Sequence, residues 1–285
     1  MRPRDAPGSE LAVGDSLGPY RLEEMLGEGG MGFVFRAVRE PDGLTVALKV
    51  LKRQLSGDGA YEARFRHEAR AAREVEHGHL VPIVDAGEID GRHYLAAKFL
   101  GGGTLQDRLD ARGRLPLADT LRLASEIGGG LDALHAPGLV HRDVKPSNIM
   151  LDEEGSAALT DFGLAKGPAY TVLTKPGMVM GTVDYIAPEL IRGEPASPAS
   201  DLYALGCVVF ECLAGSAPFE SGSIFETVTA HLEAEPRNPC AGRDDAPPGL
   251  SEAVLYALAK EPGERPRTAR AYTLMLAVAA RAGAG

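Results

Sequence analysis

A glycine-rich stretch near the start of the chain has the composition of a phosphate-binding turn. It reads GEGGMGFV and runs from Gly27 to Val34, between two segments typical of β-strands. Because glycine has no side chain, the backbone N–H groups of such a turn can approach phosphate oxygens closely. A strand on both sides, in place of a strand and a helix, argues against a dinucleotide-binding fold. Taken alone, the stretch is equally consistent with a simple hairpin turn.

A lysine and a glutamate form a second candidate pair. In a strand predicted over 45–51, alternation places Lys49 on the same face as Ala47. Glu68 falls within the apolar stripe of a helix predicted over 59–76, where a carboxylate needs a cation because burying it unpaired is costly. An isolated strand lysine is more often simply solvated. Pairing Lys49 with Glu68, however, accounts for both side chains.

Composition excludes several classes of partner. Thirty basic and 40 acidic residues give a net charge of -10, which argues against nucleic acid or anionic lipid as a default partner. The three cysteines show no CxxC spacing, which favours free thiols in a reducing compartment. We find neither the apolar core of a signal peptide nor a run long enough for a membrane span. We therefore expect a cytoplasmic protein.

The periodicity of apolar residues predicts an α+β fold in two parts. Strand-like runs separated by turns at 41–43 and 90–91 predict a small antiparallel sheet, interrupted by the helix at 59–76. Beyond the glycines at 101–103 the pattern is helical, over 117–136, 198–214, 223–234, 249–260 and 268–281. We expect a flexible lead-in over 1–18 and one domain over 19–281. It divides into a β-rich N-lobe (about 19–98), a hinge (about 98–103) and a larger α-helical C-lobe (about 104–281).

Three motifs in the second half carry a family resemblance. They read HRDVKPSN at 141–148, DFG at 161–163 and APE at 187–189. Each could be a surface cluster or a turn by itself. In this order, after GEGGMGFV and after VALK at 46–49, they resemble the eukaryotic-like (Hanks-type) protein kinases, particularly the bacterial Ser/Thr branch. The resemblance covers about 20–280. It implies a two-lobed kinase fold and transfer of the γ-phosphate of ATP to Ser or Thr hydroxyls of protein substrates.

The resemblance implies a role for each motif residue in catalysis. Asp143 would accept or orient the proton of the substrate hydroxyl, and Lys145 would steady the γ-phosphate. Asn148 and Asp161 would hold Mg²⁺, with Mn²⁺ as an alternative, since hard cations take carboxylate and amide oxygens. Lys49 would hold the α- and β-phosphates.

The resemblance also outlines an adenine pocket. The base would lie against Val34, Ala47 and Met150 and bond to the backbone near Lys98 and Leu100. Ala97, at the gatekeeper position, implies an open back pocket, and Lys98 departs from the acidic residue common in the family. The full set implied for the nucleotide is Gly27, Glu28, Gly29, Gly30, Met31, Gly32, Val34, Ala47, Lys49, Lys98, Leu100 and Met150.

The segment between Asp161 and Glu189 resembles an activation loop. Phosphate on Thr171 or Thr174 would pair with Arg142, which directly precedes the catalytic aspartate. Solvated loop threonines are the plainer interpretation. Autophosphorylation of this loop is expected, and a transient homodimer is one route to it.

Further positions match structural residues of the family. Thr182 would contact the catalytic loop, Glu189 would pair with Arg265, and Asp201 would anchor the catalytic loop from the next helix. One feature departs from expectation. The glycines at 128–130 fall inside a predicted helix, where each costs about 1 kcal/mol relative to alanine.

Two other classes of protein compete with the kinase interpretation. A pseudokinase scaffold would bind nucleotide or partners without transfer, but it usually lacks a catalytic residue, and none is missing here. A small-molecule phosphotransferase of related fold is disfavoured by Lys145, the APE motif and the threonine-bearing loop. Incubation with labelled ATP separates these alternatives.

Overall fold

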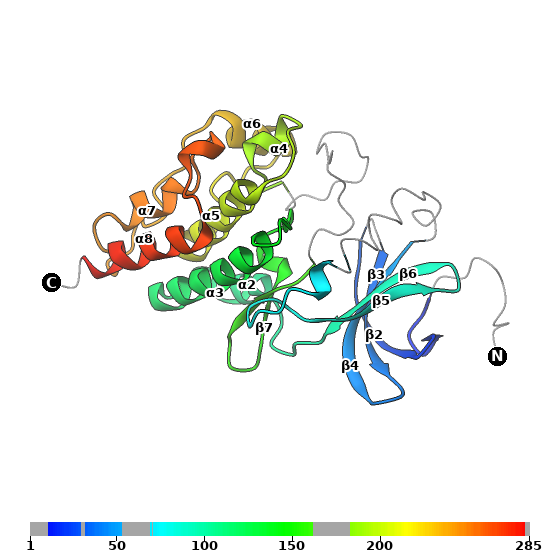
Figure 1. Ribbon diagram of the computed structural model, residues 1–285. Coiled ribbons are helices and arrows are strands. Elements are labelled where there is room, and N and C mark those ends of the chain that lie inside the picture. Colours follow the sequence, from blue (N-terminus) through cyan, green and yellow to red (C-terminus); the bar gives the residue numbers. More distant parts are fainter. Residues whose placement is uncertain (1–10, 30–31, 53–68, 70, 162–182, 283–285) are drawn as a thin grey trace. The chain divides into compact units, whose positions relative to one another are not determined.

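The computed structural model of the protein describes residues 11–29, 32–52, 69, 71–161 and 183–282 (Figure 1). The predictions for Gly30, Met31, Glu68, Thr171, Thr174 and Thr182 lie outside these ranges. The chain divides into two compact units. The N-terminal unit comprises residues 1–73 and 82–99, and the C-terminal unit comprises 74–81 and 100–285.

The N-terminal unit is built on a six-stranded antiparallel sheet with the strand order β1-β2-β3-β4-β6-β5. β1 falls inside the lead-in expected from the sequence, yet it pairs with β2, and Leu17 is buried in the core. Of the helix predicted over 59–76, Ala69 and residues 71–76 are described; Ala69 and 71–73 are helical, whereas 74–76 are not, so the helix ends earlier than predicted. The strands are β1 (Ser16–Leu17), β2 (Tyr20–Glu28), β3 (Gly32–Arg39), β4 (Leu44–Leu51), β5 (Ile83–Ile89) and β6 (Arg92–Lys98).

Two of the hairpins turn where the sequence predicts. Residues 40–43 join β3 to β4, and Asp90 and Gly91 join β5 to β6. Asp90 has φ 51° and Gly91 has φ 68°. Positive φ at both central residues is what a tight two-residue hairpin requires, because that turn matches the twist of the strands. The Asp-Gly pair therefore fixes the register of β5 against β6.

The core of this sheet follows from strand alternation. Val46, Leu48 and Val50 are fully buried, whereas Ala47 and Lys49 between them are half-buried on the opposite face. This is the alternation that the sequence predicts for β4.

A polar network lies at the edge of this core. The hydroxyls of Tyr20 and Tyr94 both donate to Oδ2 of Asp85, at 3.0 and 2.7 Å. Burial and these hydrogen bonds to the carboxylate raise the pKa of Tyr20 to about 12. Both phenols therefore stay protonated and tie β2, β5 and β6 together.

The C-terminal unit is helical apart from one small hairpin. Its longest helices, α3 and α5, agree with the predicted ranges to within a residue, but α7 ends at Tyr256, four residues earlier than predicted. The elements are α2 (Leu105–Arg112), α3 (Leu117–His135), η2 (Pro146–Asn148), β7 (Ile149–Leu151), β8 (Ala157–Leu159), α4 (Pro188–Ile191), α5 (Pro198–Ala214), α6 (Ile224–Glu233), α7 (Leu250–Tyr256), η4 (Pro262–Glu264) and α8 (Ala269–Arg281).

The three glycines inside α3 allow close packing on two sides. A Cβ at Gly128 would lie 2.9 Å from Cγ2 of Thr273 in α8. A Cβ at Gly130 would lie 2.7 Å from the carbonyl oxygen of His79, and one at Gly129 would lie 3.1 Å from the ring of His77. The helix therefore accepts the propensity cost of glycine because neighbouring segments approach its backbone directly.

Candidate active site

The hairpin of β7 and β8 brings two oxygen-bearing side chains to one end. Ile149 pairs with Leu159, and the amide of Thr160 donates to the carbonyl oxygen of Asn148 at 3.0 Å. Asn148 immediately precedes the hairpin and Asp161 follows Thr160, so the pairing holds both residues at the open end of the hairpin. Asp161 has φ 63°, a left-handed conformation that is uncommon outside glycine.

Asp143 is held by the residues that follow it in its own loop. The Nδ2 of Asn148 donates to the Asp143 carbonyl oxygen at 2.8 Å and to its Oδ2 at 2.9 Å. Lys145 Nζ forms an ion pair with the same Oδ2 at 3.2 Å. Because the amide nitrogen of Asn148 faces Asp143, its Oδ1 points away from that carboxylate. The loop thus fixes the aspartate and presents a separate amide oxygen.

Asp201, near the start of α5, anchors the loop that carries Asp143. It is buried, and its two oxygens accept the backbone N–H groups of His141 and Arg142, each at 2.8 Å. His135 Nε2 donates to the Oδ2 of Asp201, also at 2.8 Å. Arg142 has φ 65°, so the loop is strained at this residue and needs outside support. Asp201 supplies that support through the amide of the strained residue.

His141 serves as a packing and bonding residue inside the loop. It is fully buried, and its Nε2 donates to the Thr160 carbonyl oxygen at 3.0 Å while Nδ1 accepts from the Asp143 amide at 3.3 Å. This pattern requires one proton, on Nε2. Burial lowers the pKa of His141, even though nearby carboxylates oppose the shift. A neutral ring of this kind links the loop that carries Asp143 to the end of β8.

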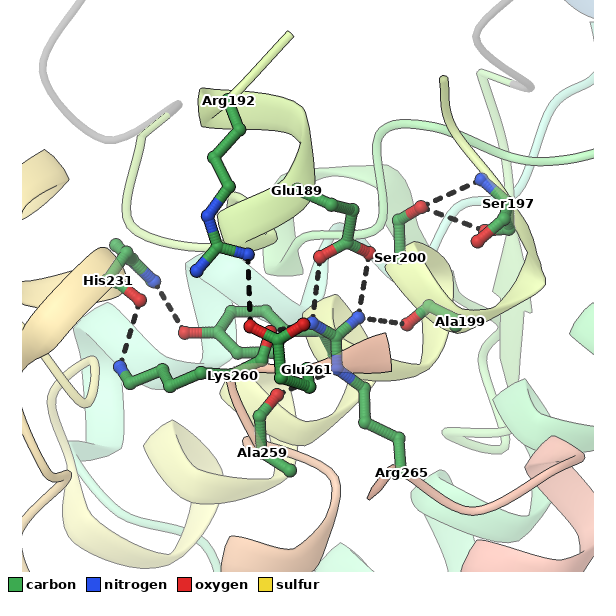
Figure 2. Close-up of polar contacts among 11 residues, drawn as sticks. Glu189, Arg192, Ser197, Ala199, Ser200, His231, Ala259, Lys260, Glu261 and Arg265 are labelled. Carbon is green, nitrogen blue, oxygen red and sulfur yellow. Dashed lines mark hydrogen bonds and ion pairs between the residues drawn. The ribbon is translucent and has the colours of Figure 1, made fainter. Parts of the chain in front are cut away.

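Glu189 and Arg265 form a buried bidentate ion pair (Figure 2). Both nitrogen–oxygen distances are 2.7 Å, and the side chains are 2% and 0% exposed. Arg265 also donates to the carbonyl oxygens of Ala199, Ala259 and Lys260, at 2.9, 2.8 and 3.0 Å. The guanidinium therefore ties α4 to α5 and to the segment before α8. The structure brings this predicted pair together.

Several predicted residues of the N-terminal unit lie on paired strands of the glycine-rich hairpin. Val34 in β3 pairs with Lys49 in β4, and Gly27 pairs with Val34. A Cβ at Gly27 would meet nothing within 4 Å, whereas one at Gly32 would overlap the Val50 carbonyl. Gly32 is thus required by the sheet. The open space beside Gly27, and likewise beside Gly29, suits the approach of a phosphate group.

A surface ion pair joins this hairpin to the end of β4. Glu28 accepts from Lys52 Nζ at 2.9 Å, and that ammonium lies 5.2 Å from the centroid of the Phe33 ring. Lys52 was not singled out by the sequence. Lys52 lies three residues after Lys49, and strand periodicity alone does not distinguish it from a lysine that is simply solvated.

The hinge residues divide between the two units. Ala97 and Lys98 end β6 in the N-terminal unit, and the amide of Lys98 donates to the Pro82 carbonyl oxygen at 2.9 Å. The Lys98 amide is therefore already engaged within the N-terminal unit. Met150 lies in β7 of the C-terminal unit, bridged to Thr104, and is half-buried.

The oxygen donors suit a divalent cation shared with a nucleotide. Among the described residues, no cluster of three or more His, Cys, Asp or Glu side chains could hold a metal alone. Mg²⁺ usually takes one or two protein carboxylates and completes its shell with substrate phosphates and water. Asp161 and the Oδ1 of Asn148 fit that mode, since they offer two hard oxygens and leave most positions to the ligand.

Comparison with known proteins agrees with this geometry. The family model of the protein kinase domain matches residues 20–272, so the chain belongs to the protein kinase family. The predicted resemblance to bacterial Ser/Thr kinases is confirmed by curated relatives. The serine/threonine-protein kinase PknD of Mycobacterium tuberculosis is 38% identical over 254 residues, which cover 89% of this chain and 38% of PknD. PknE of the same organism is 37% identical over 257 residues, covering 90% of this chain and 45% of PknE.

Solved structures confirm the predicted fold. The crystal structure of the PknI kinase domain of M. tuberculosis matches with a TM-score of 0.74 at 28% identity, covering 95% of this chain and 99% of that domain. The chain spans less than half of the length of the curated relatives that it matches. No helix in the described part of the chain has the length and apolar character needed to cross a bilayer.

Proposed function

We propose that this chain is a Ser/Thr protein kinase that transfers the γ-phosphate of ATP, bound with a divalent cation, to hydroxyls of protein substrates. The observation that carries the proposal is the fixed position of Asp143. Its carboxylate is bound by Asn148 and Lys145 within one loop. Asp161 follows β8, whose partner strand begins directly after Asn148. Family membership and the similarity to curated Ser/Thr kinases support the choice of substrate class.

Each residue of the C-terminal unit has a distinct part in this proposal. Asp143 accepts or orients the proton of the attacking hydroxyl, and its bonds to Lys145 and Asn148 hold the carboxylate in place. Asn148 and Asp161 hold the cation, for which we propose Mg²⁺ with Mn²⁺ as an alternative. When bound, that cation offsets the negative charge of the phosphate oxygens.

In the N-terminal unit we propose that Lys49 binds the α- and β-phosphates and pairs with Glu68. The glycine-rich hairpin from Gly27 to Gly32 covers the phosphates. Val34 and Ala47, together with Met150 of the other unit, contact the base. Lys98 and Leu100 bond to it through their backbone.

The proposed regulation follows from the same assignment. We propose a kinase domain over 19–281, autophosphorylation at Thr171 or Thr174 through a transient homodimer, and pairing of the added phosphate with Arg142. A cytoplasmic location remains our proposal, and it rests on composition alone.

Incubation of the chain with γ-labelled ATP tests the proposed function. The wild-type chain should become labelled in the presence of Mg²⁺, and Asp143→Asn and Asp161→Asn should each remove the label. As a control, Asp152→Asn changes a nearby loop carboxylate without touching Asp143, and it should keep the activity. Binding of ATP by the wild-type chain without transfer to any protein would favour the scaffold and contradict the proposal.

A further inference from the structure

Lys260 binds the C-terminal end of α6. Its Nζ donates to the carbonyl oxygen of Ala230 at 3.1 Å and to that of His231 at 2.9 Å, and Figure 2 shows the bond to His231. Both carbonyls belong to the last turn of α6, which forms the negative end of the helix dipole, and the Ala230 carbonyl also accepts the N–H of Ala234 at the end of the helix. The same ammonium lies 4.3 Å from the centroid of the Phe219 ring. Lys260 is thus a cation bound to a helix terminus, and it comes from a segment distant in sequence.

The side chain of His231 fixes the same turn on α5. The ring is fully buried, packs edge-on against Phe219 with 4.8 Å between ring centroids, and accepts the hydroxyl of Tyr203 at Nδ1 at 2.8 Å. Burial, and then the charge of Lys260, lowers the pKa of His231 to about 3. The ring therefore stays neutral at ordinary pH and can accept the hydrogen bond from the Tyr203 hydroxyl. The end of α6 is held from two sides.

The start and middle of α6 pack against the segment that precedes and includes α4. Val228 forms a buried cluster with Val183 and Ile191, and Ile186, Ile224 and Leu232 pack around it. Contacts between α4 and α6 belong to the same interface. The position of α6 therefore sets where residues 183–191 lie. This segment overlaps the end of the predicted activation loop and contains the APE motif at 187–189.

One short stretch, residues 259–265, binds both α4 and α6. Arg265 holds α4 directly through Glu189, and Lys260 holds α6 through its last turn. An outer ion pair between Arg192 and Glu261, at 3.4 Å, joins the same stretch to the end of α4. The positions of α4 and α6 are consequently fixed by two cations, Lys260 and Arg265, which are only five residues apart in the sequence.

We propose that Lys260 is a positioning residue for the protein substrate: by capping α6 it keeps residues 183–191 in the conformation that accepts a substrate chain. This inference rests on the proposed kinase function. Lys260 does not touch the Asp143 loop in any hydrogen bond or ion pair among the described residues. Its removal should therefore weaken the use of a protein acceptor and leave the chemistry of ATP intact.

If Lys260 had a purely structural role, its replacement would lower all activities equally. Burial lowers the pKa of Lys260 to about 8, so the ammonium is kept at neutral pH but is partly desolvated. Replacing it with methionine removes two donors and also removes that desolvation cost. We expect a small net change in Tm, so a change in substrate use can be distinguished from unfolding.

The test compares Lys260→Met and Lys260→Arg with the wild-type chain. Arg237→Met is the matched control, because Arg237 also lies over an aromatic ring, 4.9 Å from the Phe210 centroid, and donates to Ser216 and Ala217 without bonding α6. The protein substrate is the Asp143→Asn chain. For each variant, the KM for this substrate, the KM for ATP, the rate of ATP hydrolysis without protein substrate, and Tm are measured.

Lys260→Met should raise the KM for the protein substrate about tenfold, within the range expected for a cation at a partly buried helix terminus. The KM for ATP and the rate of hydrolysis should stay within about twofold. Lys260→Arg should restore most of the loss, and Arg237→Met should behave as wild type. An unchanged protein KM in an active Lys260→Met chain, or an equal loss in all activities, would overturn the inference alone. A wild-type chain that hydrolyses or transfers no phosphate would remove the proposed function together with it.

Discussion

Breaking the buried pair between Glu189 and Arg265 should destabilise the C-terminal unit strongly, and the loss should depend on which partner is removed. Arg265→Met removes two charge-assisted bonds of 2.7 Å and leaves the Glu189 carboxylate buried at 2% exposure. Bonds to charged groups contribute about 1.5–3 kcal/mol each, and loss of one partner of a buried pair typically costs about 3–5 kcal/mol. We therefore expect a loss of about 3–5 kcal/mol in the free energy of unfolding.

Removing the carboxylate of the pair should cost less free energy of unfolding than removing the guanidinium. Glu189→Met leaves the guanidinium of Arg265 bonded to the carbonyl oxygens of Ala199, Ala259 and Lys260. The double variant should recover part of the combined loss, because neither charge is then stranded, and the coupling energy should be at least about 2 kcal/mol.

Urea unfolding followed by circular dichroism measures these values, since the chain has no tryptophan to report on the core. Glu261→Gln is the control, because it breaks an ion pair to Arg192 whose side chains are 36% and 63% exposed, and it should cost less than about 0.5 kcal/mol. Single variants as mild as this control, or losses that simply add in the double variant, would refute the reasoning.

Three further predictions follow from the packing of the C-terminal unit. Gly130→Ala should lower stability by about 1–3 kcal/mol in thermal unfolding, because its Cβ would overlap the His79 carbonyl, whereas Gly129→Ala, facing a movable ring, should be close to neutral. The side chain of an Asp201→Asn variant cannot accept both backbone amides. Its kcat should therefore fall, and its free energy of unfolding should drop by about 1–3 kcal/mol. A kcat equal to that of the wild-type chain would contradict this prediction. His231 has a pKa of about 3 when folded and 6.5 as its ordinary value, so the unfolded chain binds more protons between these values and stability falls as pH drops from 6.5 toward 3. A His231→Gln chain should show a flatter dependence of Tm on pH over that range.

Regular periodicity made much of the fold predictable. In β4 the buried positions Val46, Leu48 and Val50 alternate with Lys49 as the sequence indicates, and α5 begins and ends at the predicted residues. The hairpin of β7 and β8 and the helix α2 were not predicted. Each of these strands has three residues, too few for an alternation to register, and α2 begins with a capping box at Thr104 and Asp107 and has no long apolar stripe.

For the site, motif residues could be named from the sequence, but their connections could not. Nothing in the spacing of His135 indicates that its ring donates to Asp201, and Lys260 gives no sign of capping α6, because both contacts join elements far apart in the chain. The glycines at 128–130 were recognised as costly in a helix. Only the neighbouring backbone of His79 and the side chains of α8 explain why they are there.

The most direct test of the account is transfer of phosphate from the wild-type chain to its Asp143→Asn form. Incubated with γ-labelled ATP and Mg²⁺, the Asp143→Asn chain should be labelled only when wild type is present, and hydrolysis should release phosphoserine or phosphothreonine without phosphotyrosine. Labelling of the Asp143→Asn chain on its own, label on tyrosine, or ATP turnover with no labelled protein would contradict the assignment of Asp143 as the residue that receives the substrate proton in a Ser/Thr kinase.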